Sequence, residues 1–187
     1  MERYAALSRK TKETEVSLEF SFDGGEIEVS TGVGFFDHML TAFAVHGGFG
    51  LKLKTVGDWH VDCHHTIEDT GIVLGKAFAE ALGSKRGINR FGHAYIPMDE
   101  TLGFAAADIS GRPFLVFQAE FPQERTGDFD SCMTEEFFRA FAMNAGITLH
   151  LRCEYGKNTH HMIESLFKAA AHALRKAAIL NNEDVIL

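Results

Sequence analysis

Asp62-Cys63-His64-His65-Thr66-Ile67-Glu68-Asp69 recurs, nearly unchanged, as Thr159-His160-His161-Met162-Ile163-Glu164-Ser165. Each copy has two adjacent histidines and then a glutamate, on a segment that runs into a predicted helix. Residues four apart lie on one face of a helix, so the first histidine and the glutamate of each copy can bind one ion. The second histidine is rotated by roughly 100° and is better placed to reach another ion. The repeat therefore predicts two metal ions, or one site built from two halves.

Imidazole with carboxylate suits Mn²⁺, Fe²⁺ or Zn²⁺. The plainer alternative is a pair of helix starts whose histidines bond only to nearby backbone groups. A single HHxxE stretch would fit both interpretations equally well, whereas two copies in one chain favour a metal site.

The sequence around the two copies also repeats. In each half, strand patterns broken by a glycine turn precede a helix, a short strand and the HHxxE helix. Each half reads β-β-α-β-α, which predicts an α+β fold with helices packed on one face of each sheet. We expect residues 1–90 and 91–187 to be two half-domains of one compact domain. The matched segments are 16–30 with 104–121, 36–45 with 135–143, and 51–54 with 149–152.

Alignment of the halves adds two candidate ligands. His38 precedes His64 by 26 residues and Glu136 precedes His160 by 24, and the second loop is two residues shorter, so the two occupy equivalent places. Both residue types can bind a hard-to-borderline ion. Alternatively, His38 is an exposed first-turn histidine and Glu136 an ordinary solvated carboxylate. His46 has no histidine partner in the repeat, and we expect it to orient a substrate.

Composition excludes several functions. The chain has 187 residues, 45% of them hydrophobic, which suits one sizeable core, and its formal charge is −8. Binding to a nucleic acid needs a basic surface, so we expect no such partner. Three cysteines without CxxC spacing predict reduced thiols and a cytoplasmic location. We also expect no membrane partner, because the sequence has neither a signal-peptide pattern nor a long apolar run.

Several motifs together resemble the imidazoleglycerol-phosphate dehydratase family of histidine biosynthesis, and the resemblance covers essentially the whole chain. It implies a ribosomal S5 domain 2-like fold and a homo-oligomer of 24 subunits with manganese sites between them. It also implies a hydro-lyase that converts D-erythro-imidazole glycerol phosphate into imidazole acetol phosphate, with two Mn²⁺ ions in each active site. The matching motifs are Phe36-Asp37-His38-Met39-Leu40, His46-Gly47, 62–69, Gly87-Ile88-Asn89-Arg90-Phe91-Gly92, Asp108-Ile109-Ser110-Gly111-Arg112-Pro113 and 158–167.

Carried onto this sequence, the resemblance assigns roles to single residues. Glu13 would lie near the reacting carbons, and with His46 it makes up the catalytic candidates. Arg90 and Arg112 would grip the substrate's phosphate, and Lys168 would add a polar contact. The metal ligands would be His38, His64, His65, Glu68, His160, His161 and Glu164, with Glu136 as a further candidate.

The sequence departs from the family pattern in two places. Glu136 stands where many members have one more histidine, which leaves the coordination of one metal open. Many members also continue with a Ser/Thr-Lys-Gly tail that helps to hold the phosphate, and this sequence ends at Leu187, before such a segment. Either the natural protein continues past this point or its phosphate grip is weaker.

Two other functions could use the same ligands. A dinuclear metallohydrolase would activate water and release inorganic phosphate from a phosphate ester. A metal store or metal-dependent assembly would need neither paired arginines nor a reactive glutamate. Arg90, Arg112 and Glu13 therefore favour the dehydratase.

Overall fold

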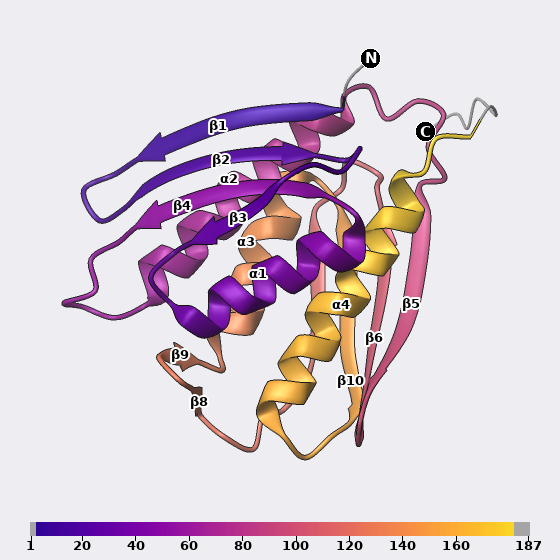
Figure 1. Cartoon of the computed structure of the whole chain (residues 1–187). Coiled ribbons are helices and arrows are strands. Elements are labelled where there is room, and N and C mark those ends of the chain that lie inside the picture. Colours follow the sequence, from indigo (N-terminus) through magenta and orange to yellow (C-terminus); the bar gives the residue numbers. More distant parts are fainter. Residues whose placement is uncertain (1–2, 182–187) are drawn as a thin grey trace.

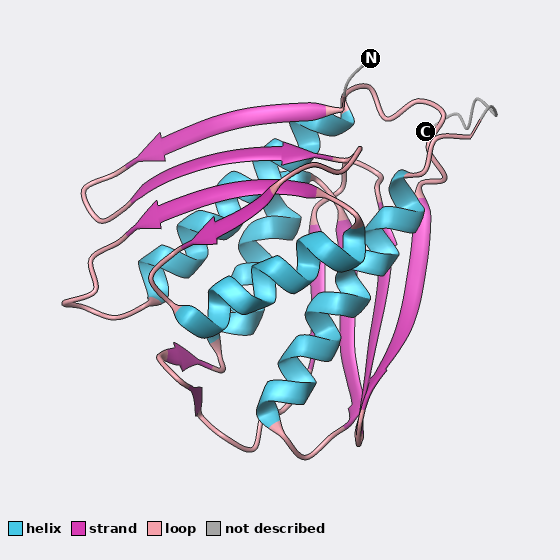
Figure 2. Ribbon diagram, in the orientation of Figure 1, coloured by secondary structure: helices cyan, strands magenta, loops and turns pink. Residues whose placement is uncertain are grey.

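The computed structural model describes residues 3–181, in which four helices lie between two four-stranded sheets (Figures 1 and 2). The first half contains β1 (Tyr4–Lys10), β2 (Glu15–Ser21), β3 (Ile27–Ser30), α1 (Gly34–Gly47), β4 (Gly50–Val56) and α2 (His64–Leu82). The second half contains β5 (Phe91–Met98), β6 (Thr101–Asp108), β7 (Phe114–Gln118), β8 (Arg125–Thr126), β9 (Phe129–Asp130), α3 (Met133–Ala145), β10 (Thr148–Tyr155) and α4 (Thr159–Ala178).

The two sheets have the same topology, so the predicted α+β class with duplicated halves is confirmed. Their strand orders are β1-β2-β4-β3 and β5-β6-β10-β7, and in each the last two strands are parallel. The strands on either side of the Asp23-Gly24-Gly25 turn are not neighbours, because β4 is inserted between β2 and β3. Alternation of apolar and polar residues indicates that a segment is a strand, but it does not indicate which other strand that segment pairs with.

Each four-stranded sheet has one more strand than the predicted β-β-α-β-α pattern, and the second half also contains the short pair β8 and β9. The first strand, β1 or β5, was not predicted, because its inward-facing residues mix a large apolar side chain, Leu7 or Ile96, with small or charged ones. On β5 these include Gly92 and Ala94, and a Cβ atom at Gly92 would lie 2.0 Å from the carbonyl oxygen of Ala173 on α4. Close packing of α4 on β5 therefore requires small residues, and small residues weaken the alternation that marks a strand in sequence.

One hydrophobic core joins the halves. Phe20 of β2 packs against Phe78 of α2, which in turn meets Phe141 of α3 at a ring-centroid distance of 5.5 Å. Helices α2 and α3 approach closely because Gly71 and Gly75 of α2 face the backbone of α3. Within residues 3–181, none of the helices combines the length and apolar character needed to cross a membrane.

Candidate metal centre

Three predicted ligands converge where α1 packs on the first turns of α4. His160 Nε2 lies 3.0 Å and His38 Nε2 3.4 Å from the same oxygen, Oε2, of Glu164. Ligand atoms of these three residues all lie within 4.8 Å of one another. Two imidazoles and one carboxylate around a common point are a donor set that fits a divalent ion such as Mn²⁺ or Zn²⁺.

The start of α4 is fixed by its capping residue. Asn158 Oδ1 accepts hydrogen bonds from the backbone N–H groups of His160 and His161, at 2.9 and 3.4 Å. Asp62 does the same at the start of α2, where its Oδ1 accepts from His64 N at 2.7 Å. Both HHxxE segments therefore begin their helices with the histidines in the first turn.

Glu164 is buried and ionised. Burial opposes ionisation, but the hydrogen bond and charge of Lys168, helped by His38 and His160, outweigh it, so the pKa of Glu164 is lowered. Lys168 Nζ lies 2.6 Å from Oε1 of Glu164. Lys168, a predicted substrate contact, is thus placed beside the histidine cluster. The carboxylate can bind a cation through Oε2 while Oε1 is held by Lys168.

The second histidine of each HHxxE copy is held by a carboxylate. His161 Nδ1 lies 2.8 Å from Glu100 Oε2, and His65 Nδ1 lies 3.0 Å from Asp58 Oδ2. The bond to His65 lowers the pKa of Asp58 and raises the pKa of the imidazole. With Nδ1 occupied as a donor, each ring can use Nε2 as a ligand, an arrangement typical of metal-binding histidines. Nε2 of His161 lies 3.9 Å from Oδ2 of the exposed Asp99, beyond hydrogen-bond distance.

The remaining predicted ligands belong to the first HHxxE copy and to α3. His64 Nε2 and Glu68 Oε2 are 3.6 Å apart. Glu136 Oε2 lies 3.7 Å from Arg139 Nε, one turn further along α3. Among residues 3–181, His64, Glu68 and Glu136 do not form a three-donor group like that of His38, His160 and Glu164.

The two catalytic candidates lie near different histidines. Glu13 is exposed in the turn between β1 and β2, and its charge contributes to the raised pKa of His65. His46, at the end of α1, has its ring centroid 5.6 Å from that of His172 on α4. The structure therefore places Glu13 by the first HHxxE copy and His46 further along the α1–α4 contact.

The predicted phosphate ligands meet at one carboxylate. Arg90 Nε donates to Asp108 Oδ1 at 2.7 Å, and Arg112 Nη2 lies 3.6 Å from Asp108 Oδ2. Arg112 is largely exposed, with 73% of its side chain accessible. Two guanidinium groups are thus held side by side. The end of the chain, on which the strength of the phosphate grip was expected to depend, lies outside the described residues.

Three residues that organise these groups were not predicted from the sequence: Asp58, Glu100 and Asp108. Asp58 carries no pattern that sets it apart from other acidic residues, and Asp108 belongs to the motif 108–113 but was given no role. Glu100 could have been found, because it lies before Thr101 as Glu13 lies before Thr14, in equivalent turns of the two halves.

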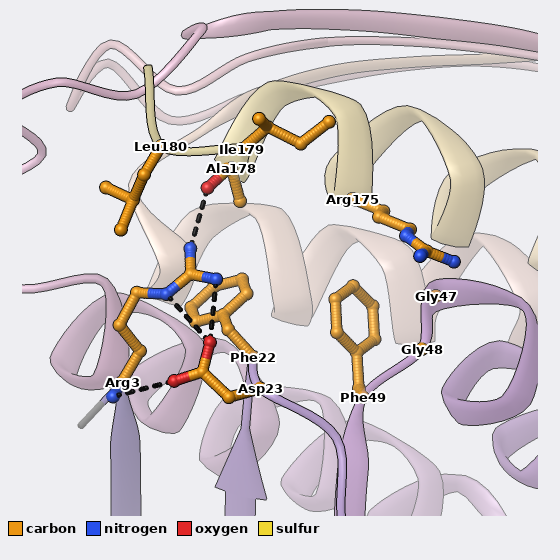
Figure 3. A pocket seen from close by; sticks show the side chains of 10 residues that line it. All are labelled: Arg3, Phe22, Asp23, Gly47, Gly48, Phe49, Arg175, Ala178, Ile179 and Leu180. Carbon is orange, nitrogen blue, oxygen red and sulfur yellow. Dashed lines mark hydrogen bonds and ion pairs between the residues drawn. The ribbon is translucent and has the colours of Figure 1, made fainter. Parts of the chain in front are cut away.

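Two hollows differ in their relation to the predicted ligands. One of about 500 Å³ is lined by His160, His161 and Glu100, among others. Another, of about 350 Å³, lies where β1 meets the end of α4, and none of the predicted ligands lines it (Figure 3). There Arg3 donates to the carbonyl oxygen of Ala178 at 2.7 Å and pairs with Asp23 at 2.9 Å. The second hollow is therefore a joint between the two halves, and the first adjoins the candidate metal centre.

The pair His46 and His172 predicts that stability falls in mild acid. Burial lowers the pKa of both imidazoles, and the positive charges of Lys168 on His46 and Lys176 on His172 act in the same direction. Glu164 raises the pKa of His46 without reversing this. The unfolded chain then binds more protons as the pH falls below about 6.5, so the free energy of unfolding decreases there.

We expect the Tm of the metal-free protein to drop more between about pH 7 and pH 5.5 in the wild type than in His172→Gln. Thermal unfolding followed by circular dichroism, with a chelator present throughout, measures both drops. Equal drops would show that this histidine pair does not carry the effect.

Comparison with known proteins places the geometry in context. The sequence model of the imidazoleglycerol-phosphate dehydratase family matches residues 31–174. The chain is 57% identical over 182 residues to the imidazoleglycerol-phosphate dehydratase of Phenylobacterium zucineum, covering 97% of this chain and 93% of that protein. It is 57% identical over 187 residues to the enzyme of the same name from Bacillus cytotoxicus, covering 100% and 95%.

Solved structures agree. The crystal structure of imidazoleglycerol-phosphate dehydratase from Staphylococcus aureus is 42% identical and superposes with a TM-score of 0.86, covering 95% of this chain and 98% of that one. The corresponding protein of Pyrococcus furiosus, in complex with (S)-C348, is 33% identical with a TM-score of 0.85, covering 96% and 97%.

Proposed function

The chain belongs to the imidazoleglycerol-phosphate dehydratase family, a family of lyases in histidine biosynthesis, and we propose that it acts at a dinuclear manganese centre. The substrate would be D-erythro-imidazole glycerol phosphate and the product imidazole acetol phosphate. One observation carries the proposal of a metal centre: the imidazoles of His38 and His160 share one oxygen of the buried Glu164.

The donor set fits manganese but is incomplete within one chain. Mn²⁺ favours six nitrogen or oxygen ligands, and His38, His160 and Glu164 supply three. His64 with Glu68 would hold the other ion, with Glu136 as a further candidate. His65 and His161, whose Nε2 atoms are left available, would complete the centres of neighbouring copies, so we propose a homo-oligomer, with 24 subunits as the expected size. When bound, the metals would act as Lewis acids and as a template for the substrate's imidazole ring.

The chain's own residues would hold the phosphate end of the substrate. Arg90 and Arg112 are brought together by Asp108, and a guanidinium group presents paired donors that match phosphate oxygens. Asp108 keeps the two positive charges close before the substrate arrives. Lys168 would add a polar contact, and His46 would orient the substrate from the end of α1.

Proton transfer falls to Glu13 in this proposal. The reaction breaks the bond to the hydroxyl beside the ring and removes a proton from the next carbon, and the resulting enol becomes the ketone. Within residues 3–181, the carboxylate of Glu13 makes no hydrogen bond or ion pair, so it is free to accept and return a proton. We also propose a cytoplasmic location, because Cys63, Cys132 and Cys153 are all free thiols.

The test is a dehydration assay coupled to metal analysis. The purified protein is stripped with a chelator, reloaded with Mn²⁺ and given imidazole glycerol phosphate. We expect turnover only after reloading, with one phosphorylated ketone formed for each substrate consumed. Release of inorganic phosphate would instead indicate a metallohydrolase. A metal-loaded protein without turnover would indicate a metal store, and either result would contradict the proposal.

A further inference from the structure

The two halves carry a glutamate at the same structural position. Glu13-Thr14 and Glu100-Thr101 lie 87 positions apart, each at the turn between the first two strands of its half. Both threonines are buried, at 4% and 1% exposure, and both begin the inward-facing positions of the following strand. The strands that follow the two turns also correspond. Leu18 of β2 pairs with Leu53 of β4, and its counterpart Ala105 of β6 pairs with Leu151 of β10.

In the second half, this glutamate is tied to a histidine. Glu100 Oε2 accepts from His161 Nδ1 at 2.8 Å, and Glu100 Oε1 accepts from the backbone N–H groups of Lys157 and Asn158 at 3.1 and 2.9 Å. These bonds hold the pKa of Glu100 well below its usual range. The carboxylate of Glu100 is therefore fixed between the turn and the start of α4.

In the first half, another residue has taken over that contact. His65, the counterpart of His161, is held by both oxygens of Asp58, at 3.0 and 3.2 Å. Asp58 comes from residues 57–63, which connect β4 to α2. The corresponding connection, residues 156–158, is shorter and contains no carboxylate. Glu13 consequently has no bond to its histidine, although its charge still acts on His65.

We propose that the duplicated turn glutamates have divided the work of the site: Glu100 positions His161, Asp58 positions His65, and Glu13 is thereby free for proton transfer. The inference rests on the proposed function in taking His65 and His161 as metal ligands and Glu13 as the proton-transfer residue. It adds Asp58 and Glu100 as positioning residues and explains why only one of two equivalent glutamates serves the reaction.

The physical basis is the orientation of the imidazole. A carboxylate on Nδ1 fixes both the tautomer and the ring plane of the neutral imidazole, so the lone pair of Nε2 points in one direction. Loss of such a partner weakens metal binding about 10- to 100-fold in characterised sites. A carboxylate that accepts the hydrogen bond from Nδ1 is held in place by that bond. A proton-transfer group, in contrast, must take up and release a proton during each turnover. One glutamate cannot do both.

The experiment compares Mn²⁺ affinity with turnover in the full-length chain. Affinity is measured by calorimetric titration of the chelator-stripped protein, and turnover by the dehydration assay. We expect Glu100→Gln and Asp58→Asn each to lower Mn²⁺ affinity about 10- to 100-fold. We expect Glu13→Gln to leave affinity within about twofold and to lower kcat about 10²- to 10⁴-fold. Glu15→Gln, which changes an exposed glutamate paired with Lys10, is the control and should change neither quantity.

A double variant sharpens the test. When Asp58 is replaced by alanine, Glu13 and Asp62 are the carboxylates whose charges still act on His65. Asp62 accepts from the backbone N–H of His64, so Glu13 is the one that can take over Nδ1 of His65. Glu13→Gln should therefore lower Mn²⁺ affinity in the Asp58→Ala background, although it does not in the wild type. Circular dichroism at about 25 °C checks that each variant is folded, and Glu100→Gln keeps an oxygen for the backbone donors of α4.

The outcomes separate the two proposals. If Glu13→Gln weakens Mn²⁺ binding as much as Glu100→Gln does, the division of work is overturned even when the wild type is an active dehydratase. If the wild type binds Mn²⁺ with the expected ranking of variants but does not turn over the substrate, the positioning roles stand and the proposed function fails. A wild type that binds no Mn²⁺ overturns both.

Discussion

Glu164→Ala is expected to weaken Mn²⁺ binding at the His38–His160 cluster by more than about 100-fold, beyond the loss typical of an indirect partner. Turnover should fall below detection. Glu164 contributes the oxygen on which both imidazoles converge, and it also neutralises Lys168 at 2.6 Å. Without the carboxylate, a lysine ammonium remains beside two imidazoles, and its charge repels a cation.

Calorimetric titration of the stripped protein with Mn²⁺ measures the effect of Glu164→Ala. The matched control is Glu80→Ala, which removes an exposed carboxylate from helix α2 and should leave both affinity and turnover unchanged. Substitution of Glu164 without a change in affinity would remove the cluster from the metal centre. A second variant, Lys168→Met, checks the charge argument, because it should not weaken Mn²⁺ binding by itself.

Arg9→Met is expected to lower the free energy of unfolding by about 2–3 kcal/mol, somewhat less than the loss seen when a fully buried ion pair is broken. Asp69 follows Glu68 on α2 and is 8% exposed, and its carboxylate contacts the Arg9 guanidinium of β1 and the hydroxyl of Thr14. Removal of Arg9 leaves that carboxylate buried with only a neutral partner. The same contacts hold the turn that carries Glu13 against the HHxxE helix, so turnover should fall as well.

Urea unfolding of the metal-free protein measures the cost of Arg9→Met. Lys10→Met is the control, because Lys10 pairs with Glu15 at the surface and such pairs contribute about 0–1 kcal/mol. Arg9→Met combined with Asp69→Leu should recover part of the lost stability, because no charge is then left buried. If Arg9→Met lowers the free energy of unfolding no more than Lys10→Met does, this interpretation is contradicted.

The repeat predicted much of the centre, because helical spacing is a local property. His160 and Glu164 lie four residues apart on α4 and share one point, as their spacing indicated. His38 was predicted from alignment of the halves, and it meets Glu164 because α1 packs on α4. Equivalence of backbone position does not determine where a side chain points, and Glu136 instead lies near Arg139.

The residues that hold the histidines could not be predicted in the same way. Asp58 reaches His65 through the path of a connecting loop, and Glu100 reaches His161 from a turn 61 residues away. Such contacts depend on how strands and helices pack, which local patterns do not encode. Strand β5 was missed for a related reason, since its small inner residues Gly92 and Ala94 are required by the close packing of α4.

Anomalous diffraction at the manganese absorption edge, from crystals grown with Mn²⁺, tests the central claim most directly. We predict two peaks for each chain: one bonded to His38 Nε2, His160 Nε2 and Glu164 Oε2, and one bonded to His64 and Glu68. Ligands from a neighbouring copy should complete both. A crystal of the active protein with no peak at His38, His160 and Glu164 would contradict the account.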